Sequence, residues 1–245
     1  MRVVAIVQAR FGSSRLPGKV LLDLGGQPAL LRCLARASRC RGIDEVVVAT
    51  STEAMDETIE RVARRAGYRT FRGDENDVLA RYVGAAKESR ADVVIRITSD
   101  CPLLDPSESG RVVEAIRASR EIDYASNVLT RRLPRGLDTE GVSIACLEQA
   151  MVESTEAADR EHVTRFVVRQ PERFRHASVG SSRSDDLSFH RWTLDTREDY
   201  RLLSRLFEEL GPRADEAGTE DVLRIFAAHP ELRAMNQDVV QKPSA

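Results

Sequence analysis

The first loop of the chain combines positive charge with glycine, a combination suited to binding phosphate. An apolar run at residues 3–7 leads directly into this loop, which carries Arg10, Arg15 and Lys19. The loop also contains small residues: Gly12, Ser13, Ser14 and Gly18. Glycine lets the backbone approach an anion closely, while arginine offers a planar fork of donors and lysine a point charge. We therefore interpret the loop as a polyphosphate site, with a solvated loop lysine as the alternative.

This loop differs from the two common nucleotide-binding loops. A P-loop has a glycine, four residues and then Gly-Lys-Ser or Gly-Lys-Thr. Here five residues separate Gly12 from Gly18, and Val20 follows Lys19, so the hydroxyl that would bind magnesium is missing. The dinucleotide pattern Gly-x-Gly-x-x-Gly is absent from the loop as well, which argues against a nicotinamide cofactor.

Two acidic residues follow apolar runs in positions suited to a metal ion. Asp100 comes shortly after the run at 93–98, and Asp195 follows the run at 191–194. Ligands of open α/β sheets bind at the carboxyl ends of the strands, and Mg²⁺ prefers one or two carboxylates together with phosphate oxygens. We favour a metal ligand over a turn cap for Asp100, whereas Asp105 is better explained as a helix N-cap. For Asp195, a role as a metal ligand and a structural role at the start of the following helix are equally favoured.

Composition argues against several classes of protein. The chain has 245 residues, enough for one large domain or two small ones, and a net charge of −2 with 31% charged residues. Without a basic excess we expect neither nucleic acid nor an anionic membrane as a partner. The apolar runs are too short for a membrane span or a signal peptide. The cysteines and histidines are scattered, which predicts reduced thiols in a cytoplasmic protein and no transition-metal site.

Residues 1–120 alternate between strand and helix patterns. Short apolar runs predict strands, and helical spacing of apolar residues, as at Ile59, Val62 and Ala66, predicts the helices between them. The expected strands lie at 3–7, 46–50, 68–71 and 93–98, and the expected helices at 28–40, 59–66, 79–86 and 112–118. This alternation predicts a Rossmann-like α/β fold, a mostly parallel sheet with helices on both faces.

The second half of the chain has a different pattern. Residues 123–144 hold short strand-like pieces broken by Pro134, Gly136 and Gly141, which predicts an antiparallel insertion at about 123–146. Further helices are expected at 147–153, 161–169, 203–210 and 219–228, strands at 174–179 and 191–194, and a frayed tail at 237–245. Because no Pro/Ser-rich linker divides the chain, we expect residues 1–245 to form a single domain.

A series of short motifs runs through most of the chain in one order. The first is Gln8-Ala9-Arg10 with Arg15-Leu16-Pro17-Gly18-Lys19, and the others lie at 47–51, 71–79, 96–103, 134–140, 161–164 and 191–195. The series resembles the cytidylyltransferases that make CMP-activated acidic sugars, the acylneuraminate and 3-deoxy-manno-octulosonate cytidylyltransferases. It is most similar to the bacterial branch named for spore-coat polysaccharide synthesis protein F. The resemblance covers roughly residues 3–210 and implies a nucleotide-diphospho-sugar transferase-like fold.

The resemblance also implies roles for individual residues. Those expected to bind CTP are Gln8, Ala9, Arg10, Gly12, Ser13, Ser14, Arg15, Lys19, Asp77 and Asp100, with Arg10, Lys19 and Asp100 as the catalytic residues. Those expected to face the acceptor are Asn127, Arg135, Asp138, Glu140 and His162. Mg²⁺ would be the cofactor, held by Asp100 and Asp195. The basic stretch at 132–135 departs from the family's pattern and leaves the identity of the acceptor open.

The implied reaction is transfer of CMP from CTP to an acidic acceptor, a 2-keto sugar acid, with release of pyrophosphate. Two alternatives remain. A metal-dependent glycosyltransferase would normally show Asp-x-Asp at the acidic strand exit, but Pro102 stands where the second acid belongs. A non-catalytic nucleotide-binding protein would bind nucleotide without turnover.

A homodimer is the expected assembly, because related cytidylyltransferases commonly pair through such an insertion. The insertion also carries apolar residues that need cover: Tyr124, Val128, Leu129, Leu133 and Leu137. We expect the insertion to lie beside the acceptor pocket of the partner subunit, with Arg131, Arg132 and Arg135 attracting the acidic acceptor.

Overall fold

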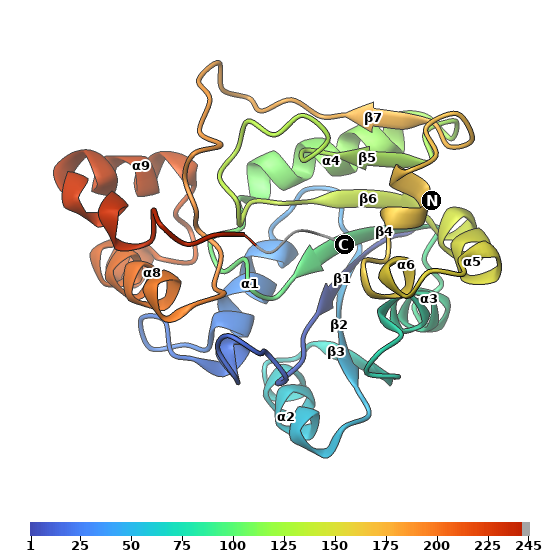
Figure 1. Cartoon of the computed structure of the whole chain (residues 1–245), viewed down its shortest axis with the longest axis horizontal. Helices are drawn as coiled ribbons and strands as arrows, with labels where there is room; N and C mark the ends of the chain where they lie inside the picture. Colours follow the sequence, from blue (N-terminus) through green and yellow to red (C-terminus); the bar gives the residue numbers. More distant parts are fainter. Residues whose placement is uncertain (242–245) are drawn as a thin grey trace.

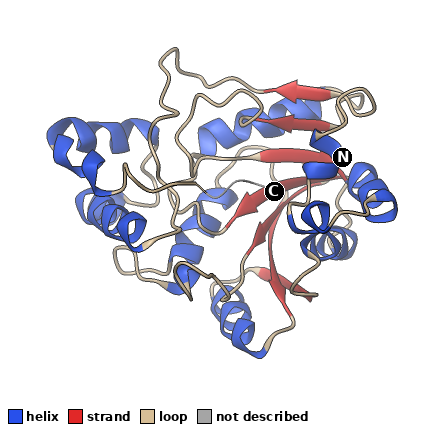
Figure 2. Ribbon diagram, in the orientation of Figure 1, coloured by secondary structure: helices blue, strands red, loops and turns tan. Residues whose placement is uncertain are grey.

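A seven-stranded sheet forms the centre of the structure, a computed structural model that describes residues 1–241 (Figures 1 and 2). The strands are β1 (Val3–Gln8), β2 (Glu45–Ser51), β3 (Arg69–Gly73), β4 (Val93–Thr98), β5 (Tyr124–Ser126), β6 (Glu140–Ser143) and β7 (His176–Ser178). Their order in the sheet is β3-β2-β1-β4-β6-β5-β7. β1 pairs in parallel with β2 and β4, and β2 with β3, which confirms the parallel half expected from the sequence.

Helices cover both faces of this sheet, as predicted. The helices on one face are α1 (Ala29–Ser38), α2 (Glu57–Arg65) and α4 (Pro106–Ala118); those on the other are α3 (Val78–Glu88), α5 (Ile144–Glu153) and α7 (Arg165–Val168). Side chains of a strand alternate between faces, so Val3, Ala5 and Val7 pack against the first layer. Val4 and Ile6 pack against the second. Because β1 is buried on both faces, its sequence is continuously apolar.

Residues 123–146 supply the antiparallel part of the sheet. β6 runs antiparallel to both β4 and β5, and β5 pairs in parallel with β7. Most apolar side chains of this segment are covered by the chain itself: Tyr124, Leu133 and Leu137 are at most 3% exposed. Val128 is partly buried and Leu129 is 37% exposed. Because most of these side chains are buried within the subunit itself, they are no argument for a dimer.

Several expected elements differ in detail. The helix expected at 161–169 is reduced to α7, and a separate helix, α6 (Ala157–Glu161), ends where it was expected to begin. Val163 between them has a φ of 46°, which a continuous helix cannot include. The strand expected at 191–194 is reduced to one bridge between Arg135 and Arg191. Residues 237–241 contain no helix or strand, and the rest of the expected tail lies outside the described residues.

The last helices form a separate apolar cluster at one end of the sheet (Figure 1). α8 (Arg197–Leu210) and α9 (Thr219–Ala228) pack there around Trp192, Leu133 and Leu137. A buried arginine of α1, Arg36, ties this end to the sheet layer, since its guanidinium donates to backbone oxygens of Leu104, Ala214 and Ala217. Short 3₁₀ helices complete the chain at Lys19–Leu21, Ala54–Asp56, Gly211–Arg213 and Pro230–Met235.

His190 should make the folded protein sensitive to mild acid. Its ring is packed among Phe189, Trp192 and Phe226, and burial together with nearby Arg233 lowers its pKa to about 4. The unfolded chain takes up this proton near pH 6.5 and the folded chain only near pH 4, so stability should fall as the pH drops through that window. Thermal melts from pH 7 to 4 should show a flatter slope for His190→Gln, and an unchanged slope would contradict this assignment.

Candidate active site at the carboxyl ends of the strands

The topology brings the phosphate loop and Asp100 to one edge of the sheet. β1 and β4 are parallel neighbours, with Gln8 aligned to Thr98, so the segments that follow them leave side by side. Asp195 reaches the same place from the C-terminal part of the chain. The backbone oxygen of Asp100 accepts hydrogen bonds from Leu194 N at 2.8 Å and from Thr193 Oγ1 at 3.1 Å.

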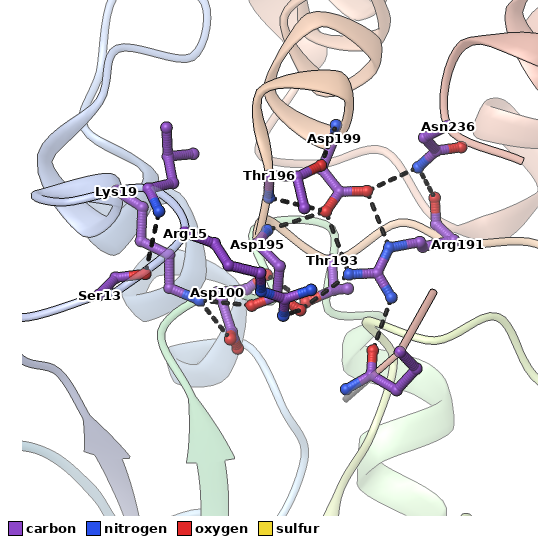
Figure 3. A network of polar contacts seen from close by, with 12 residues as sticks. Ser13, Arg15, Lys19, Asp100, Arg191, Thr193, Asp195, Thr196, Asp199 and Asn236 are labelled. Atoms are coloured by element: carbon purple, nitrogen blue, oxygen red, sulfur yellow. Dashed lines mark hydrogen bonds and ion pairs between the residues drawn. The ribbon is translucent and has the colours of Figure 1, made fainter. Parts of the chain in front are cut away.

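Lys19 bridges the two carboxylates (Figure 3). Its Nζ lies 2.8 Å from Oδ2 of Asp100 and 2.7 Å from Oδ1 of Asp195. Because 2.8 and 2.7 Å add to 5.5 Å, these two oxygens are at most 5.5 Å apart. The residues proposed from the sequence as phosphate and metal ligands thus lie together, although Asp100 and Asp195 are 95 positions apart in the sequence.

Asp195 is surrounded by further positive charge. Its Oδ2 lies 3.1 Å from the guanidinium of Arg15 and 2.8 Å from that of Arg191. Arg191 is in turn held by Asp199, which is buried and also caps the start of α8 (Figure 3). The carboxylate of Asp199 accepts from the backbone N–H groups of residues 195 and 196, so it fixes the Asp195 backbone as well. Neither Arg191 nor Asp199 was predicted from the sequence as a site residue.

The charged states of the bridge are strongly favoured. Burial would raise the pKa of the Asp100 carboxyl, but the charge of Lys19 and its hydrogen bond outweigh burial and lower that pKa to about 2. Burial would likewise lower the pKa of Lys19, yet the two carboxylates raise it. At neutral pH Asp100 is therefore a carboxylate and Lys19 an ammonium.

Phe11 and Gly18 close the phosphate loop. Gly18 has a φ of 69°, and a side-chain carbon there would lie 2.9 Å from the Phe11 ring, so glycine is required. The Gly18 N–H donates to the Phe11 carbonyl at 2.9 Å. Inside the loop, the hydroxyl of Ser13 accepts from the N–H of Leu16 at 3.3 Å. Gly12 and Ser14 are exposed.

Asp56 anchors the start of this loop and was missed by the sequence analysis. Its Oδ1 accepts from the Phe11 N–H at 2.7 Å, and its Oδ2 accepts from the hydroxyl and the N–H of Ser51. The residue is 2% exposed. Asp56 therefore joins the exits of β1 and β2. An acid five residues beyond a strand gives no sequence signal that distinguishes such a role from a helix cap.

Replacing Asp56 by alanine should weaken both the fold and nucleotide binding. The Phe11 N–H and the Ser51 groups would lose their acceptor, which costs about 1–3 kcal/mol in the free energy of unfolding. A displaced loop should also raise the KM for CTP. Urea unfolding and initial-rate kinetics would measure the two effects, with Ser51→Ala as a control that keeps the Phe11 contact. A destabilised variant with an unchanged KM would make Asp56 a structural residue only.

The other residues expected at the nucleotide lie around the loop. Ala9 is buried and its N–H donates to the Ala49 carbonyl, while the Gln8 side chain accepts from the hydroxyl of Tyr82. Arg10 faces α6, with 3.7 Å between its guanidinium and Glu161. Asp77 caps α3 and pairs with Arg160 of α6 at 2.6 Å. These contacts place α6 beside the phosphate loop.

The residues expected at the acceptor fall into two groups. Asn127, Asp138 and Glu140 are engaged within the chain. The Asn127 side chain bonds backbone groups of Leu137 and Thr139, and Asp138 pairs with Arg131 through two contacts of 2.7 Å. The buried Glu140 carboxylate accepts from Tyr124, Thr164 and Arg96. These three residues hold the segment in shape.

Arg135 and His162 form the other group. The guanidinium of Arg135 makes no hydrogen bond or ion pair with any group in residues 1–241. It lines a cavity of about 170 Å³ together with Phe189, His190 and Phe226. His162 is the C-cap residue that follows α6. Burial lowers the pKa of its ring, so the ring is neutral at pH 7. Arg135 is therefore a cationic side chain able to receive an anion.

The donor set around Asp100 and Asp195 fits a magnesium ion that also binds phosphate. Within residues 1–241, no group of three or more His, Cys, Asp or Glu side chains is placed to hold a metal ion. Two facing carboxylates are what Mg²⁺ uses when a substrate's phosphate oxygens and water complete its shell. Any metal here would compete with Lys19, Arg15 and Arg191 for the oxygens of these carboxylates.

Comparison with known proteins assigns the family. A family model described as cytidylyltransferase matches residues 4–222. The chain belongs to the cytidylyltransferase family. It is a nucleotidyltransferase by that membership, and the resemblance stated from the motifs is confirmed. Within residues 1–241 there is no helix whose length and apolar character would suit a membrane crossing.

Three relatives illustrate the range of similarity. The chain is 31% identical over 224 residues to the spore coat polysaccharide biosynthesis protein SpsF of Bacillus subtilis, covering 89% of this chain and 91% of that protein. A 3-deoxy-manno-octulosonate cytidylyltransferase of Anaeromyxobacter dehalogenans is 36% identical over 137 residues, 55% of this chain and 53% of that one. A cytidylyltransferase structure from Leptospira borgpetersenii superposes with a TM-score of 0.90 at 31% identity, covering 99% and 100% of the two chains.

Proposed function

We propose that this cytidylyltransferase transfers CMP from CTP to an acidic acceptor, a 2-keto sugar acid, and releases pyrophosphate. The observation that carries the proposal is that Lys19 of the phosphate loop contacts the carboxylates of both Asp100 and Asp195. At the carboxyl ends of β1 and β4, positive side chains that could bind a triphosphate therefore lie beside carboxylates that could bind a divalent ion. The names of the relatives, which concern cytidylyl transfer and polysaccharide synthesis, support the same substrate class.

The reaction would be an in-line displacement at the α-phosphorus. The acceptor oxygen forms a bond to this phosphorus while the bond to the bridging β-phosphate oxygen breaks, and the hydroxyl proton is released. Lys19, Arg15 and Arg10 would bind the phosphates, and the loop backbone would orient them. Asp100 and Asp195 would hold Mg²⁺, which when bound neutralises phosphate charge and lowers the pKa of the acceptor hydroxyl.

Arg135 would bind the carboxylate of the acceptor. Its guanidinium has no partner within residues 1–241 and lines a cavity, and arginine binds carboxylates through two parallel hydrogen bonds. Arg135→Ala should raise the KM for the acceptor by roughly 10- to 100-fold, the equivalent of a charge-assisted hydrogen bond, with little change in the KM for CTP. Arg132 was also expected to attract the acceptor, but it is exposed, donates to a backbone oxygen of Ser184 and does not line this cavity, so Arg132→Ala is the matched control. Equal KM values for the acceptor in the two variants would show that Arg135 does not bind the acceptor.

A screen for pyrophosphate release would test the function directly. CTP, UTP, ATP and GTP would each be combined with octulosonate, nonulosonate and other sugar acids in the presence of Mg²⁺. We expect release only with CTP and one class of acid. Activity with a nucleotide sugar as donor would favour a glycosyltransferase, and binding without turnover a non-catalytic protein.

A homodimer stays a prediction, as does the cytoplasmic location. The one large apolar side chain of the 123–146 segment that is substantially exposed in the described structure is Leu129, at 37%. Light scattering at micromolar concentration would measure the assembly, and a monomer at that concentration would contradict the prediction.

A further inference from the structure

The Lys19 ammonium occupies the place that a shared divalent ion would take. It contacts Oδ2 of Asp100 and Oδ1 of Asp195 at ordinary ion-pair distances. An ion bound to those oxygens at about 2.1 Å would need the same lone pairs and the space now filled by Nζ. The ammonium and the metal are therefore alternatives at this position.

The local charge balance favours the same conclusion. Within the described chain, the charged groups in this ion-pair network are the cations of Lys19, Arg15 and Arg191 and the carboxylates of Asp100, Asp195 and Asp199. Positive and negative charges are equal in number, so the network is neutral while Lys19 is in place. A divalent ion that entered with Lys19 still bound would leave a net positive charge in a partly buried site, which is unfavourable.

The structure also shows why Lys19 can move while the loop stays. The backbone around it is fixed by Gly18 and Phe11 and by the short 3₁₀ helix Lys19–Leu21. The lysine side chain is flexible, with an ammonium at its end. Phosphate oxygens arriving in the loop would offer that ammonium a new partner of higher negative charge.

From this geometry we infer that Lys19 keeps divalent cations away from Asp100 and Asp195 until a nucleotide's phosphates draw the ammonium away. This inference rests on the proposed function, because it takes the two carboxylates as the metal ligands. It makes metal binding dependent on nucleotide, so that the site takes up the metal together with its substrate. Lys19 then controls metal entry as well as binding phosphate.

Binding of Mn²⁺ without nucleotide would test the inference. Free Mn²⁺ would be measured by electron paramagnetic resonance at pH 8 for the wild type, Lys19→Met and Lys19→Arg. We expect Lys19→Met to bind Mn²⁺ at least tenfold more tightly than the wild type, because its carboxylates have lost their bridging cation. Lys19→Arg keeps the charge and should resemble the wild type. Lys87→Met is the matched control, since Lys87 pairs with Glu148 on the surface.

A second substitution locates the ion. Adding Asp195→Asn to Lys19→Met should abolish the gain in Mn²⁺ affinity, and thermal melts would confirm that each variant is folded. Equal Mn²⁺ affinity in Lys19→Met and the wild type would overturn the inference, and so would a gain that survives Asp195→Asn. Failure of the wild type to bind CTP would instead overturn the proposed function, while the comparison of Mn²⁺ affinities would stand.

Discussion

Asparagine at position 100 should give a protein that folds but does not transfer CMP. Asp100 provides an oxygen to Lys19 and, in the proposed mechanism, to the metal. Asparagine has the same shape without the charge, so the lost electrostatic stabilisation should amount to several kcal/mol, or at least roughly a thousandfold in kcat. Asp195→Asn should behave in the same way.

Pyrophosphate release at saturating CTP and Mg²⁺ would measure this loss. Asp23→Asn is a suitable control, because Asp23 is exposed and, within residues 1–241, its carboxylate accepts only from the Gly26 N–H. Thermal melts would separate lost activity from lost structure. If Asp100→Asn retained a tenth of the wild-type rate, the metal-binding role of this carboxylate would be wrong.

Alanine at position 19 should cause the second large loss. The ammonium of Lys19 would contact phosphate oxygens most strongly as charge builds up on the leaving pyrophosphate. Its removal should cost about 2–4 kcal/mol of transition-state stabilisation, which is roughly 30- to 900-fold in kcat. Arg10→Ala should lower turnover as well, because Arg10 belongs to the same loop.

Kinetics of Lys19→Ala, Arg10→Ala and the control Lys87→Ala would check this expectation. Turnover close to that of the wild type in both loop variants would mean that the phosphates bind elsewhere. Lys19→Ala, like Lys19→Met, should also gain metal affinity in the absence of nucleotide, whereas Lys87→Ala should not. A variant that binds Mn²⁺ better and turns over more slowly would separate the two roles of this side chain.

The parallel half of the fold could be predicted from the sequence because its signals are local. β1, β2 and β4 are short apolar runs, and continuous burial on both faces produces such runs directly. The break between α6 and α7 could not be predicted, because valine is β-branched and rarely adopts the positive φ that Val163 has here. The bridge at Arg135 and Arg191 replaces an expected strand because only one residue pair aligns there.

The candidate site was predictable in its residue types but not in its assembly. Lys19 and Asp100 follow neighbouring parallel strands, so their proximity follows from the fold class. Asp195 comes from outside the alternating βα units, and sequence spacing could not place it beside Asp100. Burial could not be predicted either. Glu140 pairs with Arg96 in the interior, whereas Arg135 lines a cavity, and the sequence does not distinguish the two positions.

The contacts from Thr193 and Leu194 to the Asp100 backbone have a consequence for biosynthesis. Domains generally fold as units during or after synthesis, and their N-terminal parts leave the ribosome first. A nascent chain that ends before residue 190 already contains the phosphate loop, β1 and β4, but not the second carboxylate. The pair of acids exists only after the C-terminal segment has docked on Asp100. The two carboxylates of the proposed site can therefore come together only after residues 193–195 have been made.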